Sequence, residues 1–99
     1  MKSEETEQKL EDVRELIDSV DRELIMLLKQ RSRLIELIIE VKQESGQAAH
    51  QPTRFAILVD SLQEIAREEG LDLELVTEVW DAIHESSQRQ QNLALKKSE

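Results

Sequence analysis

Apolar residues recur along the first part of the chain at alternating intervals of three and four positions. Starting from Leu10, the series continues with Val13, Ile17, Val20, Leu24, Leu27, Leu34, Ile38 and Val41. Intervals that alternate in this way are typical of a helix that packs along a partner helix, as in a coiled coil. A single position in the series is polar, and it holds Arg31.

Two breaks divide the chain into three helical segments. The first runs from Ser45-Gly46 to Pro52, and proline suits the first turn of a new helix. At the second, Gly70 followed by an apolar residue is typical of a helix C-terminus, and Asp72 suits the N-cap of the next helix. No useful stretch alternates with period two, so strands are not expected. The chain is predicted to be a single all-α domain, residues 1–99, with one long and two shorter helices at about 5–45, 52–69 and 72–95.

The two shorter helices each carry one apolar stripe that is expected to be buried. In the second helix the stripe consists of Phe55, Leu58, Val59, Leu62 and Ile65. In the third it consists of Leu75, Val76, Val79, Trp80 and Ile83, followed at helical spacing by Ser87 and Gln91. Two neutral polar residues therefore occupy positions at which the pattern predicts apolar residues.

The apolar surface of the long helix is too broad for one chain to cover. Ile25, Leu28, Ile35 and Ile39 widen the stripe, and a helix of this length is roughly 60 Å long. Large exposed apolar surfaces mark an interface. We therefore expect an intertwined homodimeric helix bundle in which the long helices of two copies lie side by side.

The charge and composition of the chain argue against some classes of binding partner. The 99 residues carry a formal net charge of −9, and Phe55 and Trp80 are the only aromatic residues. Nucleic-acid binding needs a basic face and stacking needs aromatic rings, so no nucleic-acid partner is expected. The chain has no cysteine, no signal-peptide pattern at its start, and no run approaching the roughly 20 apolar residues that cross a bilayer. A cytoplasmic protein without membrane contact is predicted, and any anion site must be a local cluster of cations.

Arg31 is the natural centre of such a cluster. Arg14 lies seventeen positions earlier, about 25 Å away along one helix, so no small ligand touches both. In an antiparallel pair of long helices that cross near Arg22–Glu23, however, Arg14 of one chain comes level with Arg31 of the other. Lys42 shares a face with Arg31, and Arg54 is long enough to join them. The alternative for Arg31 is an outward path along its aliphatic stem or a pairing with glutamate, and the alternative for the other three cations is a solvated surface.

The segment VRELIDSVDRELIMLLKQRSRLIELIIEVK, residues 13–42, resembles the first helix of the all-helical chorismate mutase family. In that family an Arg precedes an I-D-x-x-D-like segment, a second Arg follows L-L, and a Lys closes the helix. Arg14, Arg31 and Lys42 match these positions. The third helix matches the family ending I-x-E-x-S-x-x-x-Q through Ile83, Glu85, Ser87 and Gln91.

The resemblance implies rearrangement of chorismate to prephenate in aromatic amino acid biosynthesis by the shikimate pathway, an isomerase reaction that uses no cofactor and no metal. It implies that Lys42 and Gln91 hydrogen-bond the ether oxygen as the C–O bond breaks. Arg31 and Arg14 from the partner chain would grip the two carboxylates of the dianionic substrate, and Arg54 and Ser87 would complete that end of the pocket. His50 and His84 occupy isolated positions and are expected to be structural or to face solvent.

The start of the second helix departs from the family pattern. Typical members read D-x-x-R-E, with acids that meet the ring hydroxyl, whereas this chain has Gln51 and Phe55 at the two acidic positions. Both are expected to line the pocket. An apolar residue after Arg54 resembles the related isochorismate-pyruvate lyases, and an aminodeoxychorismate mutase is a further alternative. The Ser87 and Gln91 pattern favours the mutase.

Two interpretations without catalysis also fit parts of the pattern. A dimeric helical interaction module explains the apolar series and the acidity, but not Ser87 and Gln91. A chain that keeps the fold and has lost the activity is consistent with Phe55.

Overall fold

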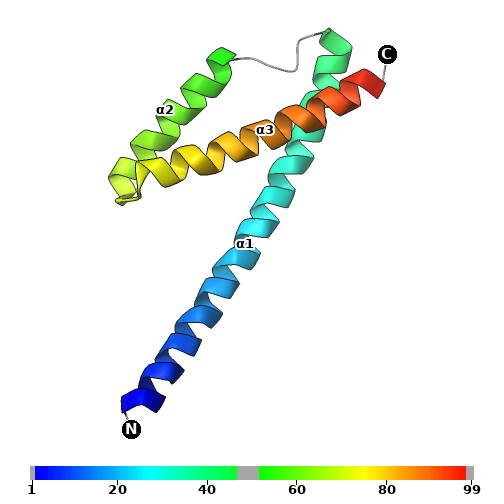
Figure 1. The fold of residues 1–99 in the computed structure, drawn as a ribbon. Helices are drawn as coiled ribbons and strands as arrows, with labels where there is room; N and C mark the ends of the chain where they lie inside the picture. Colours follow the sequence, from blue (N-terminus) through cyan, green and yellow to red (C-terminus); the bar gives the residue numbers. More distant parts are fainter. Residues whose placement is uncertain (1, 47–51, 98–99) are drawn as a thin grey trace. The chain divides into compact units, whose positions relative to one another are not determined.

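The computed structural model describes residues 2–46 and 52–97, which form three helices (Figure 1). They are α1 (Lys2–Ser45), α2 (Pro52–Glu69) and α3 (Leu73–Lys97). The prediction of an all-α chain with one long and two shorter helices is confirmed, and the predicted bounds are within three residues of the observed ones. In the part of the chain described, no helix is long and apolar enough to span a membrane.

A glycine with positive φ follows each of the first two helices. Gly46 has φ 74°, and its N–H donates to the carbonyl of Lys42 over 2.8 Å, which is the αL type of helix C-cap. After α2, Gly70 has φ 71° and donates to the carbonyl of Arg67. Leu71 donates to the carbonyl of Ala66 over 2.8 Å, which completes a Schellman motif. Both helices end where the sequence predicts because glycine adopts this conformation with little strain.

The α2–α3 turn continues directly into a capped helix start. The carboxylate of Asp72 accepts a hydrogen bond from the backbone N–H of Glu74 at 3.1 Å. This bond satisfies one of the four N–H groups left free at a helix N-terminus. Asp72 is therefore the N-cap of α3, as predicted.

The described chain falls into two compact units, Met1–Leu34 and Ile35–Glu99. The first unit is the N-terminal part of α1. From Ser3 to Leu34 every residue is exposed except Arg31, which is half-buried. The apolar series of this unit is exposed throughout: Leu10, Val13, Ile17, Val20, Leu24, Leu27 and Leu34.

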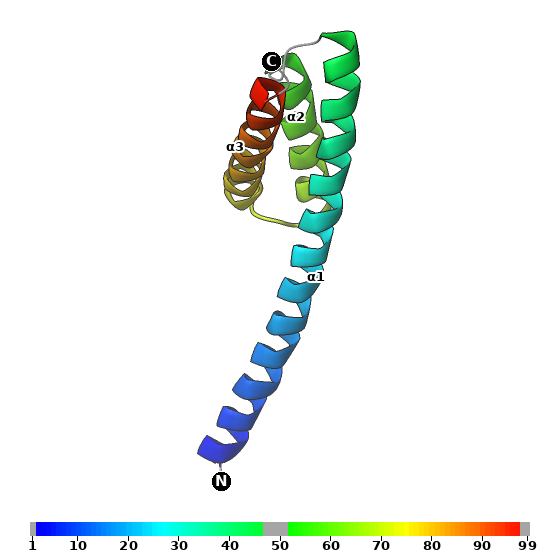
Figure 2. The same ribbon diagram turned by 90° about the vertical axis from the view of Figure 1, so that its right-hand side faces the viewer.

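The second unit consists of the C-terminal part of α1 together with α2 and α3. Figures 1 and 2 show α2 and α3 as a helical hairpin, and the Gln63 amide donates to the Thr77 hydroxyl across it at 3.0 Å. The residues buried in this unit are Ile35, Ile39, Ala66, Val76, Ser87 and Gln91. The core is therefore small, and two of its six members are polar.

Three apolar residues predicted to be buried are exposed, namely Ile65, Leu75 and Val79. A pair of packed helices covers one strip along each partner, and side chains beyond that strip stay open. Leu75, for example, is 51% exposed although the adjacent Val76 is buried. The expectation of burial was wrong for these three residues within the single chain.

Candidate active site

The second unit joins two of the predicted site residues directly. The Nζ of Lys42 donates a hydrogen bond to Oε1 of Gln91 at 2.7 Å. Lys42 lies in the last turn of α1 and Gln91 in the second half of α3. Gln91 is only 5% exposed, so its amide is held among buried side chains. The pair links two helices that are far apart in the sequence.

The chemistry of the pair fixes the orientation of the amide. A lysine ammonium has donors and no acceptor, so only the oxygen of Gln91 can face it. The amide nitrogen, which has two N–H donors, must then point away from Lys42. The pair consequently offers donors to a ligand from both partners. Such an arrangement suits an oxygen atom on which negative charge develops.

Burial changes the titration of Lys42. Desolvation penalises the charged ammonium and lowers the pKa of Lys42 below its ordinary value of 10.5. The position near the C-terminus of α1 favours a cation, because the last carbonyls carry partial negative charge.

Ser87 is the second polar residue of this core. It is 8% exposed and lies four residues before Gln91, so both side chains project from the same face of α3. The sequence predicts an apolar residue at each of these positions, and the structure buries a hydroxyl and an amide there instead. A polar patch on α3 therefore lies inside the second unit and adjoins Lys42.

Phe55 and His84 stack on each other across the α2–α3 hairpin. Their ring centroids are 3.8 Å apart and the ring planes are inclined by 19°. Both residues are half-buried. His84 is therefore not isolated, although its stacking on Phe55 is compatible with the predicted structural role. Phe55 lies fifteen positions before Gly70 and His84 fourteen after it, and this near-symmetry was the available signal.

The other predicted site residues are divided between the two units. Arg14 and Arg31 belong to the first unit, where Arg14 is exposed and Arg31 half-buried. Arg54 is exposed in the first turn of α2. Gln51 and His50 lie outside the described residues. Within residues 2–46 and 52–97, no group of three or more His, Cys, Asp or Glu side chains could hold a metal ion.

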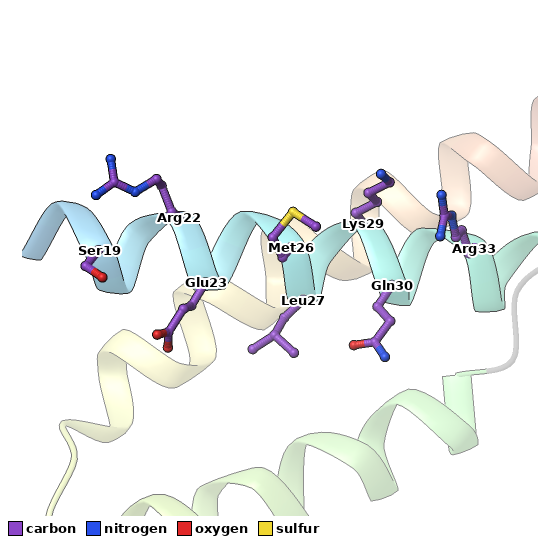
Figure 3. A pocket seen from close by; sticks show the side chains of 8 residues that line it. All are labelled: Ser19, Arg22, Glu23, Met26, Leu27, Lys29, Gln30 and Arg33. Atoms are coloured by element: carbon purple, nitrogen blue, oxygen red, sulfur yellow. The ribbon is translucent and has the colours of Figure 1, made fainter.

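A shallow hollow lies along α1 in the first unit (Figure 3). It is lined by Ser19, Arg22, Glu23, Met26, Leu27, Lys29, Gln30 and Arg33. In Figure 3 Arg22, Lys29 and Arg33 extend from the same side of the helix. Binding sites for small molecules bury most of the ligand surface, and residues of one helix cannot do so. The Lys42–Gln91 pair, which joins two helices, is therefore the better candidate.

Comparisons with known proteins agree with the sequence resemblance. The family model for chorismate mutase type II matches residues 13–92. A chorismate mutase of Methanocaldococcus jannaschii is 22% identical over 92 residues, which is 93% of both chains. The T-protein of Haemophilus influenzae is 33% identical over 70 residues, which is 71% of this chain and 19% of that protein. No solved structure matches.

The chain belongs to the chorismate mutase type II family, whose model covers both ends of the Lys42–Gln91 pair. The predicted resemblance and the predicted enzyme class, a chorismate mutase and thus an isomerase, are confirmed.

Proposed function

We propose that this chain converts chorismate to prephenate in a site centred on Lys42 and Gln91. The observation that carries the proposal is the 2.7 Å hydrogen bond between these two side chains, in a chain whose family has this activity. In the reaction one C–O bond breaks and one C–C bond forms within the same molecule. No proton or electron is exchanged with the protein, so a nucleophile and a general acid are not needed.

Catalysis of such a reaction depends on two physical effects. The protein holds the substrate in a folded conformer in which the reacting carbons are close. It also stabilises the negative charge that develops on the ether oxygen as the C–O bond breaks. Lys42 supplies a positive charge, and Gln91 supplies N–H donors whose direction Lys42 fixes. Both groups are partly or fully shielded from water, which strengthens their electrostatic effect.

The proposal includes a homodimer formed along α1. The exposed apolar series in the first unit, seven residues from Leu10 to Leu34, is a surface that a second copy can cover. The two α1 helices run antiparallel and cross near Arg22–Glu23. Since 14 and 31 add up to the same number as 22 and 23, Arg14 of one copy lies level with Arg31 of the other.

In this dimer each site receives residues from both copies. Arg14 of the partner and Arg31 bind the two carboxylates through charge-assisted hydrogen bonds. Arg54 and the hydroxyl of Ser87 complete the carboxylate end. The place of Arg31 as the single polar member of the apolar series supports its inclusion in this group. The cytoplasmic location remains a prediction from the sequence.

A second candidate reaction is release of pyruvate from isochorismate on the same scaffold, with an aminodeoxychorismate rearrangement as a variant. The observation that favours it is the Phe55 ring, which is half-buried and stacked on His84 where typical relatives have an acid. Purified protein is therefore assayed with chorismate, isochorismate and the amino analogue in parallel. If chorismate is consumed faster than the other two substrates, the result supports the mutase reaction. If isochorismate alone is consumed, the result contradicts the mutase reaction.

The pH dependence of chorismate turnover tests the role of Lys42. A lowered pKa means that the ammonium loses its proton, and with it its charge, at a lower pH than an ordinary lysine. We therefore expect kcat/KM to fall on the alkaline side with a midpoint below 10.5. In the Lys42→Arg variant the midpoint of this alkaline decrease in kcat/KM moves to higher pH, because guanidinium stays charged over this range. An alkaline fall at the same pH in both proteins contradicts the assignment.

A further inference from the structure

The stacked pair of Phe55 and His84 is not used by the proposed reaction, and it has the geometry of a recognition element. The rings come from two different helices, and they lie nearly parallel with centroids 3.8 Å apart. Stacking fixes the plane of the imidazole, while both ring nitrogens remain at the edge of the ring. One nitrogen of a neutral imidazole donates a hydrogen bond and the other accepts one.

The position of His84 on α3 connects it with the candidate site. Residues 84, 87 and 91 project within about 60° of one another at 3.6 residues per turn. His84 is thus the first member of a polar track that continues through the buried Ser87 to Gln91, which is bonded to Lys42. The track is about 10 Å long at 1.5 Å per residue, comparable with a six-membered ring and its substituents.

We propose that His84 is a specificity-determining residue that hydrogen-bonds a hydroxyl or amino substituent on the substrate ring, and that Phe55 is the residue that positions its imidazole. This inference rests on the proposed function, because it takes Lys42 and Gln91 as the other end of the same site. A neutral imidazole suits either substituent, since it has one donor and one acceptor. The Phe55 ring presents an apolar surface beside it that offers nothing to a charged group.

The physical reason for selectivity is the cost of an unsatisfied polar group. A site that hydrogen-bonds a substituent discriminates strongly against a substrate that lacks the group in that position. An apolar wall discriminates much less between ring substituents. Removing the imidazole should therefore make the kcat/KM values for related ring substrates more alike. Its effect on folding stability should be the smaller of the two effects.

The test compares His84→Leu and Phe55→Leu with the wild-type protein on chorismate, isochorismate and the amino analogue. The measured quantity is the ratio of kcat/KM values between the preferred substrate and each of the others. For His84→Leu we expect this ratio to fall about 10-fold, as for one lost hydrogen bond. Phe55→Leu should also lower this ratio of kcat/KM values, but by a smaller factor than His84→Leu. The double variant should be no worse than His84→Leu alone, because Phe55 acts through the imidazole.

Thr77→Val is the matched control, because it removes a hydrogen bond between the same two helices at a distance from the polar track. It should lower the melting temperature and leave the substrate ratio unchanged. If His84→Leu lowers turnover of all three substrates in parallel, the role of His84 is structural and the inference is overturned, while the proposed function stands. A wild-type protein that turns over none of the three substrates overturns both.

Discussion

Replacing Lys42 with Met is expected to lower kcat on chorismate by about 10²–10³-fold, the usual effect of removing one donor to a developing oxyanion. Met keeps most of the side-chain volume but has neither charge nor donor. The loss should fall mainly on kcat, because the interaction with the ether oxygen is strongest as the C–O bond breaks. Steady-state kinetics with purified protein measure the change.

The substitution also affects folding, and the two effects can be separated. Gln91 loses the donor to its oxygen at a position that is 5% exposed, which costs about 1–3 kcal/mol of unfolding free energy. Kinetics are therefore measured well below the melting temperature of the variant. Lys29→Met is the control, because Lys29 is an exposed lysine on the same helix. A Lys42→Met protein that is folded and retains near-normal kcat contradicts the site.

Replacing Leu24 with Glu is expected to convert the protein from a dimer to a monomer and to abolish turnover. Leu24 is 52% exposed in the single chain and lies beside the proposed crossing point near Arg22–Glu23. In the dimer two copies of the new carboxylate would be buried at the interface, at a cost of several kcal/mol per ion. Without the partner, Arg14 is missing from each site. Light scattering and the chorismate assay, at one fixed protein concentration, report both losses.

Met26→Glu is a closely matched control for this experiment. Met26 is also an exposed apolar residue of α1, at 59%, but it lies outside the apolar series and projects from the opposite side of the helix. The same charge change there should leave the dimer and its activity intact. Equal effects of the two substitutions, or a wild-type protein that is already a monomer, would refute the proposed interface.

Much of the fold could be predicted because the relevant signals are local. Gly46 and Gly70 end their helices with positive φ, and Asp72 caps the next helix with its own carboxylate. The start of α1 lies three residues before the predicted one, and Ser3, a residue type favoured at N-caps, lies inside the helix and does not mark its start. Helix ends are therefore predicted best where a residue has a special conformation or a capping side chain.

The candidate site was harder to predict from the sequence, since it depends on contacts between residues that are distant in the chain. The spacing of polar residues marked Ser87 and Gln91 as unusual, but only the family resemblance paired Gln91 with Lys42. The stack of Phe55 on His84 was missed because periodicity along one helix does not report which residues of the next helix lie opposite. The grouping of Arg14 with Arg31 is harder to predict for a different reason. It depends on how the long helices of two copies align, which is a property of the assembly and not of one chain.

In the proposed dimer, one site takes Arg14 from one copy and Arg31 from the other. Arg14→Ala and Arg31→Ala should each be nearly inactive, and the two are unfolded, mixed in equal amounts and refolded. Half of the dimers are then mixed, and each mixed dimer has one intact site of two, so activity should recover to about one quarter of wild type. Mixing Arg31→Ala with Lys42→Met should give no recovery, because both residues come from the same copy. A mixture of Arg14→Ala and Arg31→Ala that stays as inactive as its components would contradict the shared site.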